Sequence, residues 1–135
     1  MVRRLKLVLE YDGTAYRGWQ VQPGLDTIQG RLETALSRLA GTPVRVMGAG
    51  RTDAGVHALG QVASCDALLR LDDVALRRAL NALLPQDIVV SQVEPAPPEF
   101  DARRCARSKT YRYTLLRRAY PSAQHGRYSL YVPYA

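Results

Sequence analysis

The 135-residue sequence predicts an α+β fold built on an antiparallel sheet. Four short runs are rich in alternating apolar or β-branched residues, as strands are, and two longer stretches repeat apolar residues at helical spacing. Glycine- and proline-rich turns separate these runs. Hydrophobic residues make up 47% of the chain, which excludes a disordered protein and allows one core.

The N-terminal part predicts a strand, a loop and a helix. Residues 5–11 alternate large apolar residues with mostly polar ones, so we expect a strand with one buried face. Residues 14–26 predict an irregular loop, in which Trp19 most simply packs over the end of the core. The Asp-Thr pair at 26–27 can cap a helix that stops at Gly41. The apolar face of this helix is Ile28, Leu32, Ala35, Leu36 and Leu39.

The next part predicts three strands and a second helix. Residues 44–47 and 59–65 predict strands on either side of a glycine-rich loop, and residues 88–93 predict another strand. Before that last strand, Asp72 or Asp73 can cap a helix. The apolar positions of this helix are Val74, Leu76, Leu80, Leu83 and Leu84.

The order strand-helix-strand-strand-helix-strand matches the split βαβ, or ferredoxin-like, arrangement with both helices on one face of the sheet. A stiff, proline-rich connector at residues 94–99 and a fifth strand at residues 108–116 follow. We expect a ferredoxin-like unit over residues 1–98 and a strand and tail over residues 99–135. The bare face of the sheet is expected to meet solvent, a partner, RNA or further chain.

Positive charge is concentrated in the C-terminal segment. Residues 1–98 carry 11 Lys/Arg and 10 Asp/Glu, whereas residues 99–135 carry 8 Lys/Arg and 2 Asp/Glu. The second segment also contains six of the eight tyrosines. Basic side chains interleaved with aromatic ones suit nucleic acid, and a solvated basic tail explains the charge alone equally well.

Other classes of protein are disfavoured. No apolar run approaches the ~20 residues of a membrane span, and the basic N-terminus leads into an alternating strand, so no membrane partner is expected. The two cysteines, Cys65 and Cys105, are far apart in sequence, which favours unpaired thiols and a cytoplasmic protein.

The candidate site is the glycine-rich loop at residues 48–57, with the sequence GAGRTDAGVH. A carboxylate between glycines, Asp53, can be lifted clear of the surface and can act as a nucleophile or base. Arg51 can hold that carboxylate ionised, or can contact a phosphate or a base. The alternative is a turn aspartate that satisfies the amides of its own loop.

Cofactor sites fit this loop poorly, and none is expected. A dinucleotide-binding motif requires a glycine where Asp53 stands and a helix after the loop, whereas the loop leads into a strand. His57 has no partner at a metal-ligand spacing and is more simply a hydrogen-bonding structural residue.

The loop closely resembles the active-site loop of the tRNA pseudouridine synthase A family. Three further stretches agree with that family in order and spacing: residues 10–20 (EYDGT, then GWQ), residues 81–88 (NALLP, then DI) and residues 100–113 (FDAR, then KTYRY). The resemblance covers nearly the whole chain.

The resemblance implies that uridine is isomerised to pseudouridine in the anticodon stem-loop of tRNA, at positions 38, 39 and 40, without a cofactor. By the same resemblance, Asp53 is the catalytic residue that attacks the flipped-out nucleotide, Arg51 helps to hold that conformation, and Tyr111 stacks on the uracil. The residues expected to meet the tRNA phosphates are Arg103, Arg104, Arg107 and Lys109.

Members of the family are about twice this long and carry a second half of similar topology. We therefore expect this chain to be the half with the catalytic aspartate, without the second half, and to form a homodimer if full length. Two functions remain open: an RNA-modifying isomerase, or a truncated, non-catalytic RNA-binding remnant of one.

Overall fold

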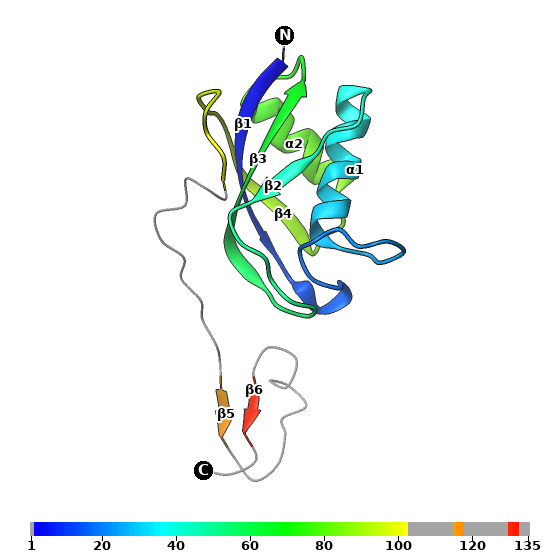
Figure 1. Ribbon diagram of the computed structural model, residues 1–135, viewed down its shortest axis with the longest axis vertical. Coiled ribbons are helices and arrows are strands. Elements are labelled where there is room, and N and C mark those ends of the chain that lie inside the picture. The colour runs from blue at the N-terminus through cyan, green and yellow to red at the C-terminus, as the bar shows by residue number, and fades with distance from the viewer. Residues whose placement is uncertain (1, 103–114, 118–129, 133–135) are drawn as a thin grey trace.

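The computed structural model describes residues 2–102 and two short strands at residues 115–117 and 130–132. Residues 2–102 form a four-stranded antiparallel sheet in the order β2-β3-β1-β4, and both helices cover one face of it (Figure 1). The elements are β1 (Val2–Tyr11), the short helix η1 (Gly13–Ala15), α1 (Ile28–Ala40), β2 (Val46–Gly48), β3 (Ala58–Leu68), α2 (Asp73–Leu83) and β4 (Ile88–Pro95). The predicted ferredoxin-like arrangement is confirmed for this part of the chain.

The two short strands form a separate sheet. Here β5 (Leu115–Arg117) pairs in parallel with β6 (Leu130–Val132). The fifth strand predicted at residues 108–116 overlaps β5 at its last two positions, and its earlier residues lie outside the described part of the chain.

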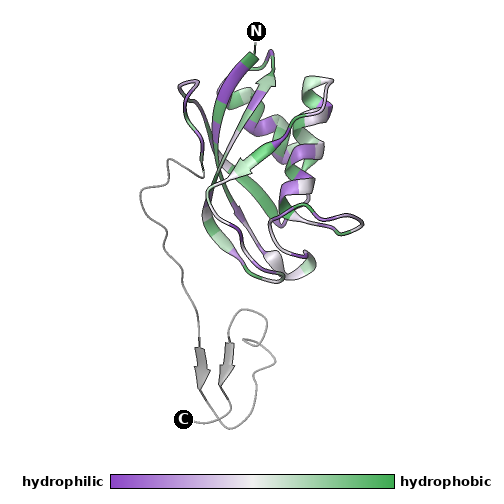
Figure 2. Cartoon of the chain, in the orientation of Figure 1, coloured by the Kyte–Doolittle hydropathy of each residue, from purple (hydrophilic) through white to green (hydrophobic). Residues whose placement is uncertain are grey.

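The core lies between the sheet and the two helices. Apolar and polar residues are interspersed along both helices, as expected for amphipathic elements (Figure 2). Trp19 packs into this core with its side chain 2% exposed, as the sequence predicts. The large side chains with no exposed surface include Leu5, Leu7, Leu9, Ile28, Leu32, Leu36, Leu76 and Leu80.

The predicted apolar face of α2 is too wide. Leu76 and Leu80 are fully buried, but Val74 is 55% exposed and Leu83 is 37% exposed. Val74 precedes Leu76 by two positions, a rotation of about 200° around the helix axis, so it lies on the solvent side.

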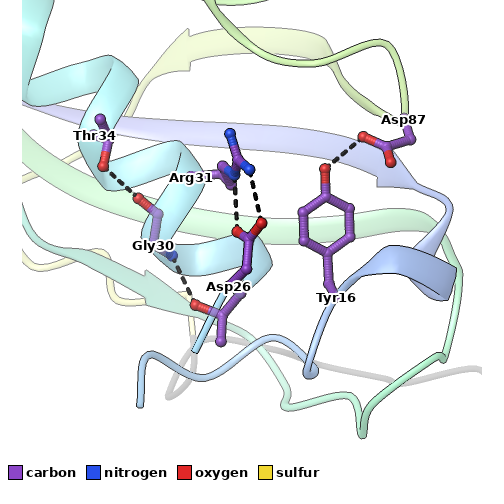
Figure 3. Close-up of polar contacts among 7 residues, drawn as sticks. Tyr16, Asp26, Gly30, Arg31, Thr34 and Asp87 are labelled. Carbon is purple, nitrogen blue, oxygen red and sulfur yellow. Dashed lines mark hydrogen bonds and ion pairs between the residues drawn. The ribbon is translucent and has the colours of Figure 1, made fainter. Parts of the chain in front are cut away.

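Side-chain caps fix where α1 begins. The Thr27 hydroxyl accepts a hydrogen bond from the Gly30 amide at 3.2 Å, so Thr27 is the cap. Asp26 instead forms a two-point ion pair with Arg31 at 2.8 and 2.7 Å (Figure 3), and these hydrogen bonds lower the pKa of Asp26. The helix ends at Gly41, which has a positive φ of 75°, as predicted.

The central strands are longer than predicted. The predicted strand at residues 5–11 starts at Val2 in the structure, and the one at residues 59–65 runs on to Leu68. Across the added length, the Arg4 guanidinium is ion-paired with the Asp66 carboxylate of the neighbouring strand. Opposite charges on facing strands stabilise a sheet. A prediction based on the alternation of apolar residues does not reveal such pairs.

The edge strand β2 is held by α1. The Val46 amide donates to the Glu33 carboxylate at 2.9 Å, and the Val46 carbonyl accepts from the Gln29 amide at 2.7 Å. These bonds occupy backbone groups that an edge strand otherwise leaves unpaired. They also fix the point from which the glycine-rich loop departs.

The face of the sheet that the helices leave bare is partly covered by the chain after β4. The Ala102 amide donates to the Ser64 hydroxyl at 3.1 Å, and the Arg4 guanidinium donates to the Phe100 carbonyl. The predicted connector at residues 94–99 therefore begins as the end of β4 and continues as a segment that packs on the sheet.

Candidate active site

The glycine-rich loop joins β2 to β3, which pair as an antiparallel hairpin. Its first residues are fixed by β3, because the Ala49 amide donates to the Val62 carbonyl at 2.8 Å. The Gln61 side-chain amide then donates to the Gly50 carbonyl at 2.7 Å. The loop thus leaves the sheet with a defined backbone.

Further bonds come from the segment that follows β1. The Trp19 amide donates to the Thr52 carbonyl at 3.0 Å, and the Gly55 amide donates to the Tyr16 carbonyl at 3.3 Å. The Tyr11 hydroxyl shares a hydrogen bond of 2.8 Å with the Thr52 hydroxyl. Backbone or side-chain bonds therefore hold the loop on both sides of Asp53.

Two glycines allow this segment to approach the loop. A Cβ atom at Gly18, which has a φ of 91°, would lie 2.7 Å from the Thr52 carbonyl oxygen. A Cβ atom at Gly13 would lie 2.0 Å from the Val56 carbonyl oxygen. Only residues without a side chain fit at these contacts. The segment predicted only as an irregular loop is thus one wall of the candidate site.

The same segment is tied to the start of β4. The Tyr16 hydroxyl donates to the Asp87 carboxylate at 2.5 Å (Figure 3), and burial raises the pKa of Tyr16 well above its usual value. The Asp12 amide donates to the Asp87 carbonyl at 2.9 Å. Three stretches that carry the family resemblance, at residues 10–20, 48–57 and 81–88, are therefore joined by direct contacts.

His57 is a hydrogen-bonding residue, as the sequence predicts. Its Nδ1 accepts from the Gly13 amide at 2.9 Å and lies 3.1 Å from an Asp12 carboxylate oxygen. One nitrogen cannot accept from Gly13 and donate to Asp12 at once, so the first contact requires an Nδ1 without a hydrogen and the second an Nδ1 that carries one. Both contacts connect the end of the loop to the turn after β1.

Asp53 and Arg51 are both exposed on the loop. The Val56 amide donates to the backbone carbonyl of Asp53 at 3.1 Å, not to its carboxylate. Within residues 2–102, neither the Asp53 carboxylate nor the Arg51 guanidinium forms a hydrogen bond or an ion pair with another described residue. The loop backbone is therefore held while these two charged groups stay accessible.

The other predicted site residues cannot be placed beside Asp53. Tyr111 lies outside the described residues, as do the four basic residues expected at the tRNA phosphates. Those four are Arg103, Arg104, Arg107 and Lys109.

A pocket of about 340 Å³ opens beside the end of the loop. Its lining includes His57, Leu59, Glu10, Asp12 and Asp87, and it includes neither Asp53 nor Arg51. In the described part of the chain, no three His, Cys, Asp or Glu side chains are grouped to hold a metal ion.

A helix that could span a membrane is absent from the part of the chain that the structure describes.

A family model described as "tRNA pseudouridine synthase" matches residues 7–103. The chain is 53% identical over 114 residues to tRNA pseudouridine synthase A of Maridesulfovibrio salexigens, an alignment that covers 84% of this chain and 42% of that protein. It is 46% identical over 136 residues to tRNA pseudouridine synthase A of Geobacillus kaustophilus, covering 100% of this chain and 53% of the relative.

The chain thus spans about half the length of the curated relatives that it matches. The family match extends over the sheet, both helices and the loop that carries Asp53. The chain belongs to the tRNA pseudouridine synthase family.

Proposed function

We propose that this protein isomerises uridine to pseudouridine in tRNA, in the anticodon stem-loop at positions 38, 39 and 40. The N1–C1′ bond of uridine breaks, the uracil turns, a C5–C1′ bond forms, and the proton on C5 is lost while N1 gains one. Reactant and product contain the same atoms, so the reaction needs no co-substrate. The family match and the names of the curated relatives support the reaction class.

Asp53 is the proposed nucleophile, and one observation carries this assignment. Its carboxylate is exposed and has no partner within residues 2–102, although the backbone around it is bonded on both sides. A turn aspartate with a purely structural role bonds to nearby amides instead. An ionised carboxylate held on a fixed backbone can attack a carbon of the nucleotide, on the ribose or on the base.

The remaining residues have roles that follow from the substrate. A stem nucleotide must leave its stack to reach the carboxylate, at a cost of a few kcal/mol. Arg51 is proposed to hold the flipped conformation, and Tyr111 is proposed to stack on the uracil, a contact typically worth ~1–3 kcal/mol. The basic segment after residue 98 is proposed to contact phosphates, in line with its excess of Lys/Arg over Asp/Glu.

Further proposals concern the assembly and compartment. The protein is proposed to act without a cofactor, as a homodimer when full length, and in the cytoplasm. The wide separation of the two cysteines in sequence supports a reducing compartment.

Chemical mapping of pseudouridine in an anticodon stem-loop RNA tests the reaction and its position. The wild-type protein is expected to produce pseudouridine at one or more of positions 38, 39 and 40, and D53N is expected to bind the RNA without producing it. RNA binding with no pseudouridine from the wild-type protein would favour the non-catalytic remnant. Pseudouridine only at other positions would contradict the proposed substrate site.

A further inference from the structure

Thr52, the residue directly before Asp53, is bonded through both its side chain and its backbone. Its hydroxyl shares a 2.8 Å hydrogen bond with the Tyr11 hydroxyl, and its carbonyl accepts from the Trp19 amide at 3.0 Å. The other bonds between the loop and its neighbours are at Ala49, Gly50, Gly55 and His57. Of the bonds that join the loop to the rest of the described chain, those of Thr52 lie nearest in sequence to Asp53.

The partner of the Thr52 hydroxyl is itself rigidly held. Tyr11 is the last residue of the central strand β1, paired with Ala58 on one side and Ile88 on the other. Its side chain is 4% exposed, and its ring stacks on that of Trp19 with the centroids 6.3 Å apart. A hydroxyl on so buried a ring requires hydrogen-bond partners, and Thr52 is one of them.

We infer that Tyr11 and Thr52 form a positioning pair that fixes the backbone next to Asp53. The inference rests on the proposed role of Asp53 as the catalytic carboxylate. The hydrogen bond transmits the position of the central strand to the loop, across 41 residues of sequence. Small displacements of a reacting group can cost about 100-fold in rate, so a fixed loop backbone has a direct effect on turnover. Neither residue touches the nucleotide in this account.

Steady-state kinetics with tRNA test the catalytic half of the inference. T52V removes the hydroxyl at nearly constant volume, whereas T52S keeps it. We expect about a fivefold to tenfold lower kcat for T52V and for Y11F, with KM unchanged, and a kcat for T52S within about twofold of wild type. The double variant Y11F/T52V is expected to lose less activity than the product of the two single losses, because both changes remove the same bond.

Limited trypsin digestion tests the structural half without any dependence on activity. Arg51 is an exposed trypsin site inside the loop, and Y11F leaves the cleaved sequence unchanged. Mass spectrometry is expected to show faster cleavage after Arg51 in Y11F than in wild type. Cleavage after Arg70, which is exposed between β3 and α2, is the internal control and should not change.

The outcomes separate the two claims. If D53N is inactive while T52V retains the wild-type kcat, the positioning role is wrong and the proposed role of Asp53 stands. If D53N is as active as wild type, the proposed role of Asp53 is wrong, and the digestion alone decides whether the pair fixes the loop. Cleavage of Y11F after Arg51 at the wild-type rate would overturn the inference in every case.

Discussion

Gly18 occupies a position where a side chain would displace the loop that carries Asp53. It has a φ of 91°, and a Cβ atom would lie 2.7 Å from the Thr52 carbonyl oxygen. Gly24 offers a matched control, because it has a φ of 73° but nothing within 4 Å of its Cβ position. A comparison of substitutions at Gly18 and Gly24 therefore separates the cost of backbone strain from the cost of contact with the loop.

We expect G24A to cost about 1–2 kcal/mol of unfolding free energy, from the left-handed backbone alone. G18A is expected to cost about 1–3 kcal/mol more, because it adds an overpacked contact with the loop backbone. Urea unfolding measures both variants. Equal free energies of unfolding for G18A and G24A would mean that the loop does not pack against Gly18.

Cys65 makes the fold sensitive to alkali. Burial raises the pKa of its thiol to about 12, from about 8.5 in a model peptide. Between these values the unfolded chain loses this proton and the folded chain keeps it, so stability falls as pH rises, by up to about 1.4 kcal/mol per pH unit. We expect Tm to fall from pH 9 to 11 less steeply in C65A than in wild type. Parallel Tm curves for the two proteins would contradict this.

At the scale of elements, α2 is held to the sheet by a narrow apolar stripe. Leu80 is fully buried, whereas Val74 on the same helix is 55% exposed. We expect L80A to lose about 2–5 kcal/mol of unfolding free energy through a core cavity, and V74A to change it by less than about 0.5 kcal/mol. Denaturant unfolding measures both, and a comparable loss in V74A would show that the helix packs by another face.

The sequence predicts the existence and order of these elements because the burial of one face leaves a local apolar period. It does not predict their ends. The Arg4–Asp66 ion pair joins the added length of β1 and β3, and β2 is held by hydrogen bonds with Gln29 and Glu33 of α1. Such polar contacts join residues far apart in sequence and leave no periodic pattern in it.

The residues of the candidate site could likewise be predicted only in part. Asp53 and Arg51 stand out in the sequence because charged residues are rare in a glycine-rich loop. The roles of Tyr11 and Gly18 as supports of that loop could not be predicted, because each depends on a contact across more than thirty residues of sequence. The resemblance to a family marked the segment that contains them, but not what they contact.

At the scale of the whole molecule, positive charge is unevenly distributed along the sequence. Residues 1–98 carry nearly equal numbers of basic and acidic residues, and the excess of basic residues lies beyond them. We therefore expect tRNA affinity to depend on the basic segment. R77E/R78E, on α2, is the matched control because it makes the same change of charge within residues 1–98.

R103E/R104E is expected to weaken tRNA binding at least about tenfold at physiological salt, and to reduce the slope of log affinity against log salt by about 2. R77E/R78E is expected to change that slope much less. Filter binding over a salt series measures both variants. The same slope change in the two would remove the proposed tRNA-binding role of the basic segment.

Release of tritium from tRNA labelled at carbon 5 of uridine tests the role of Asp53 most directly, since that hydrogen leaves only if the uracil is rejoined through C5. The account predicts release by the wild-type protein, no detectable release by D53N, and wild-type release by E99Q, which changes an exposed carboxylate outside the loop. Release by D53N at the wild-type rate would contradict the assignment of Asp53 as the catalytic residue.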